Sequence, residues 1–169
     1  TTGTRNVSIG IDALDSNTTQ NDQIAIGYQA LSGVTGTSYE NIAIGSYALK
    51  VAGDGALQNV SIGAQSMEAA TTAYRCVAIG YRALEANQTT NTTVAVGWYS
   101  LREMTTGGEN TGLGHYTLTR TTTGASNTAV GYLGMQYNTT GAYNTAVGSR
   151  ALDANTTANH NTSVGYNAL

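Results

Sequence analysis

A single glycine recurs along this chain at nearly constant intervals. The intervals are 17, 18 and 18 residues, followed by six intervals of 17, so that ten units fill the 169 residues. The ten glycines are Gly10, Gly27, Gly45, Gly63, Gly80, Gly97, Gly114, Gly131, Gly148 and Gly165. A repeat of this regularity indicates that each unit is one structural element stacked on the next, and no other feature of the sequence restricts the fold as strongly.

The positions around each glycine are equally regular. The residue before the glycine is always Ile, Val or Leu, the residue two before it is Ala, Ser or Gly, and the residue four after it is Leu or Met. The position four before the glycine is Asn in seven units, namely Asn6, Asn41, Asn59, Asn110, Asn127, Asn144 and Asn161. The other three units carry Gln23, Cys76 and Thr93 there. Each unit therefore has the same order of apolar, small and amide side chains.

The short unit favours a β-solenoid over a helical solenoid. Helical repeats run longer than about thirty residues, whereas each unit here combines a glycine with β-branched residues and clusters of Thr and Asn. We predict a short strand such as 77–79, a glycine bend, a second short extended piece ending in Leu, and a polar turn. Coils stacked at roughly 4.8 Å give a rod on the order of 45 Å long.

Each column then has a predicted role. We expect the Ile/Val and Leu/Met columns to form a continuous core, with Val147 and Leu152 among its members. The glycine fits a bend with positive φ or a close approach of two backbones, and the Asn column is suited to a ladder of amides between coils. The two longer units are expected to place their additional residue in the turns at 34–40 and 52–58.

The strand segments point to more than one chain. Large apolar residues alternate with small ones, so both faces of each strand are suited to burial, and a thin monomeric rod is less favourable than an oligomer. The position three before the glycine is Val or Ile in the first six units. It becomes Thr in the last four units, at Thr111, Thr128, Thr145 and Thr162. We therefore expect the surface lined by this column to become more polar along the rod.

The motif "N-x-A-[IV]-G" followed by "x-x-A-L" resembles the repeats of the left-handed parallel β-roll heads of trimeric autotransporter adhesins. The stretch "YNTTGAYNTAVG", Tyr137 to Gly148, is similar to repeats in phage tail fibres and related viral surface fibres. The resemblance covers the whole chain, although adhesin-head repeats are usually shorter than the unit found here. It implies a homotrimer whose strands line a threefold axis.

On this resemblance, residues 1–169 are a single left-handed β-roll domain and a segment of a longer extracellular fibre. The implied function is structural support for host attachment by a virion appendage, with the head of a bacterial trimeric adhesin on the cell surface as the alternative. The partner implied first is a second and third copy of the same chain.

The sequence offers no site for catalysis, a cofactor or a metal ion. Charged residues are 10% of the chain and the net charge is −3, which argues against nucleic acid as a partner. His115 and His160 occupy different columns without ligands at metal-binding spacing, and Cys76 replaces an Asn of the ladder. The stretch "TTGGENTGLG" lacks the Lys and the helix of a phosphate-binding loop. No apolar run is long enough to insert in a membrane.

Two surface features remain as candidates for binding. Eight of the twelve aromatic residues fall one or two positions after a repeat glycine, and the densest group is Trp98, Tyr99 and Tyr116 with His115. Such rings can stack on a glycan or anchor a protein receptor, but we favour packing between coils, because aromatic pairs stabilise sheets by themselves.

The second feature is a pair of Thr residues eight and nine positions after the glycine. Both members are present in six units, as Thr18-Thr19, Thr71-Thr72, Thr105-Thr106, Thr122-Thr123, Thr139-Thr140 and Thr156-Thr157. Stacked coils would arrange them in regular rows that order water, so an ice-binding solenoid is an alternative function. Because neighbouring residues point to opposite faces, only one Thr of each pair can line an outer row, and turn chemistry also accounts for the pairs.

Overall fold

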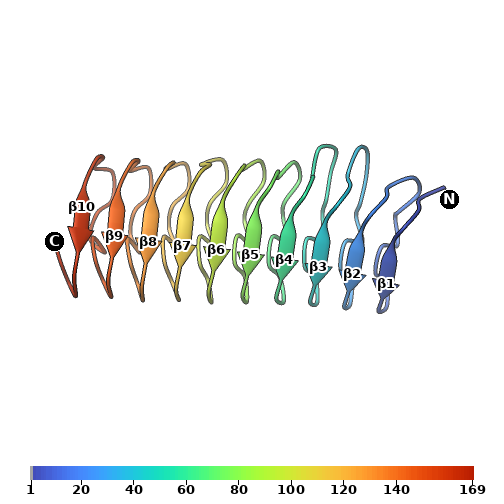
Figure 1. Ribbon diagram of the computed structural model, residues 1–169, viewed down its shortest axis with the longest axis horizontal. Coiled ribbons are helices and arrows are strands. Elements are labelled where there is room, and N and C mark those ends of the chain that lie inside the picture. Colours follow the sequence, from blue (N-terminus) through green and yellow to red (C-terminus); the bar gives the residue numbers. More distant parts are fainter. Residues whose placement is uncertain (1) are drawn as a thin grey trace.

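The computed structural model describes residues 2–169 and is an all-β solenoid (Figure 1). The chain winds into a rod in which each coil contributes one short strand to a single parallel sheet, in the order of the sequence. The strands are β1 (Val7–Ile9), β2 (Ile24–Ile26), β3 (Ile42–Ile44), β4 (Val60–Ile62), β5 (Val77–Ile79), β6 (Val94–Val96), β7 (Thr111–Leu113), β8 (Thr128–Val130), β9 (Thr145–Val147) and β10 (Thr162–Val164). The two ends of the chain lie at opposite ends of the rod. The predicted β-solenoid is confirmed.

The register of the sheet follows the glycine repeat without a slip. Ala25 pairs with Ala43, and Ala129 pairs with Ala146, so equivalent residues of successive coils lie side by side along the rod. A shift by one residue would turn every inward side chain outward, and the constant unit length prevents it. The sequence columns are therefore real columns in space.

Outside the strands, the coil turns by placing ordinary residues in the left-handed region. Thirty non-glycine residues have φ between 45° and 60°, three in each coil. Gln29, Leu31 and Glu40 illustrate the three positions, which lie two, four and about twelve residues after a glycine. The predicted second extended piece ending in Leu is wrong, because alternate left-handed residues bend the backbone there into a corner. Its amides still bond to neighbouring coils, as from Leu31 N to Ala48 O at 3.1 Å.

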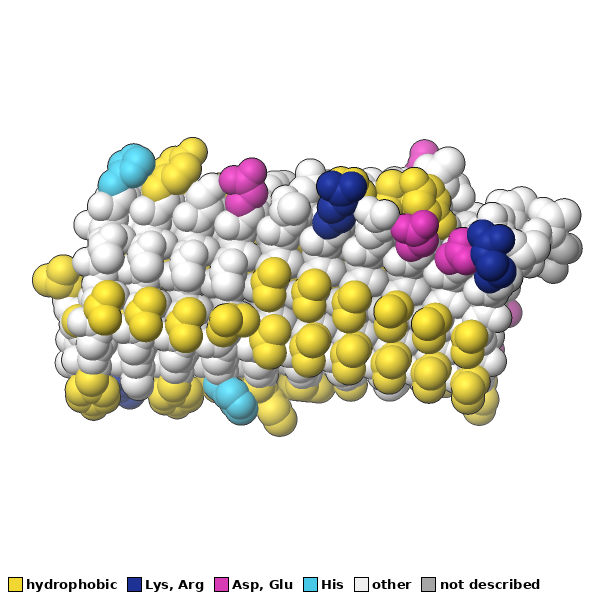
Figure 2. All heavy atoms as spheres, viewed as in Figure 1, with side chains coloured by type: hydrophobic (Ala, Val, Ile, Leu, Met, Phe, Trp, Pro, Cys, Tyr) yellow, Lys and Arg dark blue, Asp and Glu magenta, His cyan; other side chains and the backbone are white. Residues whose placement is uncertain are grey.

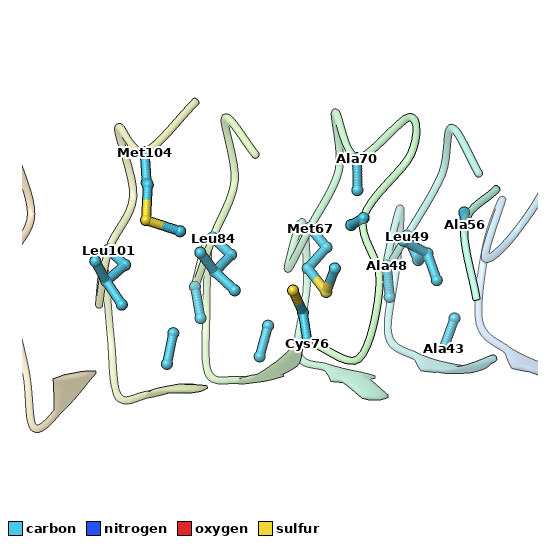
Figure 3. Packing of buried hydrophobic residues seen from close by; sticks show 14 of the residues in the cluster. Ala43, Ala48, Leu49, Ala56, Met67, Ala70, Cys76, Leu84, Leu101 and Met104 are labelled. Carbon is cyan, nitrogen blue, oxygen red and sulfur yellow. The ribbon is translucent and has the colours of Figure 1, made fainter. Parts of the chain in front are cut away.

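Two columns of side chains face each other in the core, one of large side chains and one of small side chains. Leu31, Leu49, Met67, Leu84 and Leu101 are fully buried, and Figure 3 shows four of this Leu/Met column following one another inside the coils. The strand centres face them with small residues, which are Ala in six of the ten strands. Some coils bury a second large side chain three residues later, as with Val34 after Leu31 and Met104 after Leu101.

The Ile/Val column does not belong to this core, and the prediction that it does is wrong. Strands β2, β3, β4 and β6 bury only their central residue, and their flanking residues are half-exposed. Val147, expected in the core, is 38% exposed, whereas Leu152 is 5% exposed. Side chains alternate between the two faces of a strand, so burying the alanines turns their branched neighbours outward.

The two 18-residue units differ from the others in the turns where their additional residue was expected. The loops before β3 and β4 extend farther from the sheet than the other loops in Figure 1. They contain Gly36 with φ 60° and Gly55 with φ 90°, which are the glycines with positive φ outside the repeat column. The register of β2, β3 and β4 is unaffected by these loops.

The repeat glycine marks the point where the strand ends and the coil bends. Its φ lies between 123° and 137° in all ten coils. A Cβ on Gly45 would lie 2.6 Å from the carbonyl of Gly63 in the next coil, so both the backbone angle and the contact require glycine there.

Candidate functional site

The outward face of the sheet is a uniform surface that runs along the whole rod. Sixteen of its twenty side chains are Val, Ile or Leu, at the first and third positions of β1–β10, and none is charged. We call these twenty side chains the apolar band. Figure 2 shows it as two rows of hydrophobic side chains along the right-hand part of the molecule, where β1–β6 lie. The band is a continuous strip on the order of 45 Å long.

The apolar band narrows from two rows to one after β6. The first strand position changes from Val94 in β6 to Thr111 in β7 and remains Thr through β10, while the third position stays apolar. In Figure 2 one hydrophobic row continues over this part of the sheet. The expected increase in polarity along the rod is thus located on the outer face of the sheet.

The Asn column forms a ladder of amides on the inner side of the same sheet. Asn127 shows the pattern, because its Nδ2 donates to Oδ1 of Asn110 at 3.1 Å and to the carbonyl of Gly141 at 2.8 Å. Its own Oδ1 accepts the backbone amide and the Nδ2 of Asn144, at 3.0 and 3.1 Å. These bonds join Asn110, Asn127, Asn144 and Asn161 without interruption. The amides therefore lock the positions of successive coils.

The ladder continues through a substitution at one coil and is interrupted at two others. Asn6 and Asn41 are joined through Gln23, whose backbone amide donates to Asn6 and whose Oε1 accepts from Asn41. Asn41 then bonds to Asn59, whose Oδ1 accepts the backbone amide of Cys76. The Cys76 thiol donates to the Thr90 carbonyl of the following coil at 3.4 Å, and the Thr93 hydroxyl donates to the nearby Asn91 carbonyl at 3.2 Å, so neither side chain bonds to the preceding member of the column. The column is divided into two separate ladders.

The aromatic cluster suggested by the sequence is only partly assembled. Trp98, Tyr99 and Tyr116 lie together with Tyr81, with ring centroids 4.9 to 5.9 Å apart. Arg82 and Arg102 lie over the rings of Tyr81 and Tyr99. His115 is exposed and takes part in none of the ring pairs found among residues 2–169. The rings pack mainly on one another, which stabilises neighbouring coils, and Trp98 at 46% exposure is the ring most open to a ligand.

In four of the six pairs the two Thr residues have different environments. The first hydroxyl donates to a carbonyl of the next coil, as from Thr105 to Thr122 at 3.1 Å and from Thr139 to Thr156 at 2.9 Å. The second Thr is exposed in six successive coils, as Thr72, Thr89, Thr106, Thr123, Thr140 and Thr157. One outer row of hydroxyl side chains therefore runs along more than half of the rod.

The titratable side chains are dispersed over the coils. Within residues 2–169, no three His, Cys, Asp or Glu side chains come together as a metal site. Burial raises the pKa of the Cys76 thiol, and His160 stacks on Tyr143 at 5.0 Å. The same part of the chain contains no helix long and apolar enough to cross a membrane.

Comparison with known proteins leaves the geometry as the basis for assigning a function. No protein-family model matches the chain, and neither a curated protein nor a solved structure matches it.

Proposed function

We propose that the chain is a structural segment of a trimeric surface fibre, in which the apolar bands of three copies face one another around a common axis. The observation that carries the proposal is that one face of an all-parallel sheet is covered by the chain's own core while the other is apolar and bare. Parallel sheets are almost always covered on both faces.

The composition of the band supports association with an apolar partner. Val7, Ile9, Ile79 and Leu113 are between 37% and 59% exposed, and the strip is much longer than the scattered apolar residues of ordinary surfaces. A second copy offers the same strip with the same coil spacing, so rows of branched side chains can interdigitate along the whole rod. A closed symmetric assembly also removes the strip from water without leaving a copy unmatched.

The choice of three copies and of a left-handed β-roll rests on the resemblance to fibre and adhesin-head repeats. In that setting the segment is a rigid spacer of a phage or viral tail fibre that supports host attachment outside the cell. The alternative is the head of a bacterial trimeric adhesin. Neighbouring sequence distinguishes them, because a chaperone or virion-attachment domain indicates a viral fibre and a membrane-anchor barrel indicates an adhesin.

Light scattering on the purified chain during size-exclusion chromatography tests the assembly. Three copies of 17.4 kDa give about 52 kDa, and we expect this mass at micromolar concentration. A mass of 17.4 kDa that persists as the concentration is raised would contradict the proposal. A dimeric mass would still support burial of the apolar band but would contradict the threefold axis.

Ice binding is a second candidate function, favoured by the row of six exposed Thr side chains. Their spacing along the rod is that of the coils, about 4.8 Å, and a regular row of hydroxyl and methyl groups can order water. Thermal hysteresis measured at millimolar concentration tests it. A freezing point equal to the melting point excludes ice binding, whereas a hysteresis gap that disappears in Thr123→Lys supports it.

A further inference from the structure

A groove crosses the loops that precede β6, β7, β8 and β9. Its volume is about 420 Å³, within the range of roughly 300–1,000 Å³ typical of ligand sites. Thr89, Thr106, Gly108, Glu109, Ala125 and Tyr143 are among the residues that line it. The groove shares no residue with the apolar band and none with the aromatic cluster.

The groove exists because one column loses its large side chains halfway along the rod. Eleven or twelve residues after the repeat glycine, the earlier coils carry Tyr39, Leu57 and Tyr74, which are joined by parallel bridges. The same column continues with Asn91, which is bridged to Tyr74, and then with Gly108 and Ala125, as shown by Ser126 N bonding to Gly108 O and Tyr143 N to Ala125 O, both at 3.1 Å. The side chain in this column thus shrinks from tyrosine to asparagine, then to the hydrogen atom of Gly108 and the methyl group of Ala125, and the surface is hollowed there.

One end of the groove is formed by a fixed aromatic ring. Tyr143 is 60% exposed, and His160 from the following coil stacks on it with ring planes inclined by 2°. His160 covers one face of the ring, and Tyr143 lines the groove from the side of Ser126 and Glu109. The ring is held in position before any ligand arrives, which lowers the entropic cost of binding.

The remaining walls carry hydroxyl groups and one carboxylate. Glu109 accepts a hydrogen bond from the Ser126 hydroxyl at 2.9 Å through one oxygen, and it forms none of the ion pairs found in residues 2–169. Thr89 and Thr106 add two exposed hydroxyls. A carboxylate and hydroxyls beside an aromatic face can accept and donate hydrogen bonds to several vicinal hydroxyl groups at once.

We propose that this groove binds a neutral saccharide, whose pyranose ring packs its C–H face on Tyr143 while its hydroxyls bond to Glu109 and the Thr side chains. The carboxylate repels sialylated, sulfated and phosphorylated ligands, and no arginine or lysine lines the groove to offset it. The polar lining provides little apolar area for a peptide side chain apart from the tyrosine ring and Ala125. The inference concerns a site separate from the assembly surface.

A glycan array with several hundred defined structures, probed with the fluorescently labelled full chain, tests the proposal. We expect binding to one or more neutral glycans, followed by at least a tenfold loss of affinity in Tyr143→Ala, which removes the stacking face. Ala125→Leu fills the floor of the groove and is expected to cause the same loss. Tyr137→Ala is the matched control, because Tyr137 is an exposed tyrosine of a neighbouring loop that packs with Arg120 outside the groove.

The outcomes separate clearly. Absence of binding to every neutral glycan, binding only to anionic glycans, or binding that both groove variants retain overturns the proposal. Circular dichroism and thermal midpoints close to those of the unmodified chain show that the variants are folded, and Tyr143→Phe, which keeps the ring, should retain binding. Light scattering reports the assembly independently, so a failure of saccharide binding and a failure to form a trimer are distinguishable.

Discussion

The first six coils and the last four build the same backbone with different surfaces. Strands β1–β6 carry two apolar rows, and the chain before Met104 holds both 18-residue units and all four ion pairs found among residues 2–169. Strands β7–β10 carry one Thr row and one apolar row, and the chain after Met104 has only Glu109, Arg120, Arg150 and Asp153 as charged residues. In this second part the amide ladder is unbroken from Asn110 to Asn161.

The difference shows which positions the solenoid itself requires. The glycine, the inward Leu or Met and the small strand centre are retained along the rod, because each contacts its equivalents in the neighbouring coils. The outward position three before the glycine changes from Val to Thr without any change in register. The fold therefore constrains the inside of the coil, while the outward face of the sheet can vary.

The largest expected effect comes from placing a charge in the same column of the two regions. Val60→Asp introduces a carboxylate where the band has two apolar rows, and we expect the assembly to dissociate to monomers at micromolar concentration, since burying an unpaired charge costs several kcal/mol. Thr145→Asp places the same charge beside hydroxyls and is expected to keep the assembled mass. Light scattering measures both, and equal behaviour of the two variants would reject a difference in how the regions are covered.

The repeat glycine should matter equally in both regions. Gly45→Ala and Gly131→Ala each place a Cβ 2.6 Å from the next coil at a φ above 120°, and we expect each to reduce the free energy of unfolding by about 4 kcal/mol. In Gly165→Ala the nearest atom to the new Cβ is 3.8 Å away, so only the backbone strain of about 1–3 kcal/mol at φ 132° remains. Urea unfolding checks the series, and a loss for Gly165→Ala as large as the other two would remove the role assigned to the close approach.

Substitutions in the amide column should lower the free energy of unfolding more where the ladder is continuous than where it is interrupted. Asn127→Ala removes the side-chain bonds to Asn110 Oδ1 and the Gly141 carbonyl, and it leaves the buried backbone amide of Asn144 without its acceptor, for which we expect a cost of about 3 kcal/mol. Thr93→Ala removes a hydroxyl that donates only to the nearby Asn91 carbonyl, and we expect less than about 1 kcal/mol. Thermal unfolding of the two variants gives the comparison. Similar losses would mean that the ladder contributes no more than an isolated hydrogen bond.

The glycine interval was sufficient to predict the solenoid, because a constant unit allows only one register between coils. It also located the turns with the additional residues and the Leu/Met core. The prediction that Val147 lies in the core was wrong, although the sequence contained the information that places it outside. Asn144 and Ala146 are two residues apart and so share a face, and an amide ladder is stable only when it is shielded from water. That ladder places Ala146 inside and Val147 outside.

The corners of the coil could not be predicted from residue types. Leu31, Gln29 and Glu40 have no preference for positive φ, and left-handed residues other than Gly, Asn and Asp are uncommon. They adopt it because hydrogen bonds to both neighbouring coils and the packing of the Leu column compensate for the local strain. The groove was missed for a related reason, since Gly107-Gly108 was considered only as a phosphate loop, and a hollow depends on the side chains of the coils on either side.

The smallest expected effect is a gain in the free energy of unfolding, from repairing one of the two interruptions in the amide column. In Cys76→Asn, the new amide is in position to donate to the Thr90 carbonyl, as the thiol does now at 3.4 Å, and to Oδ1 of Asn59, which already accepts the Cys76 backbone amide. We expect the free energy of unfolding to rise by about 1 kcal/mol, because a bond to Asn59 is gained and an amide replaces the weak thiol donor to the Thr90 carbonyl, while a small apolar side chain is lost from the core. Cys76→Ser, which keeps a short donor but has no amide to bond with Asn59, is the control and should be neutral or destabilising. If Cys76→Asn is also destabilising, the break reflects the packing of Thr90 and Asn87 around a compact side chain, and the first region is stabilised by its core rather than by a continuous ladder.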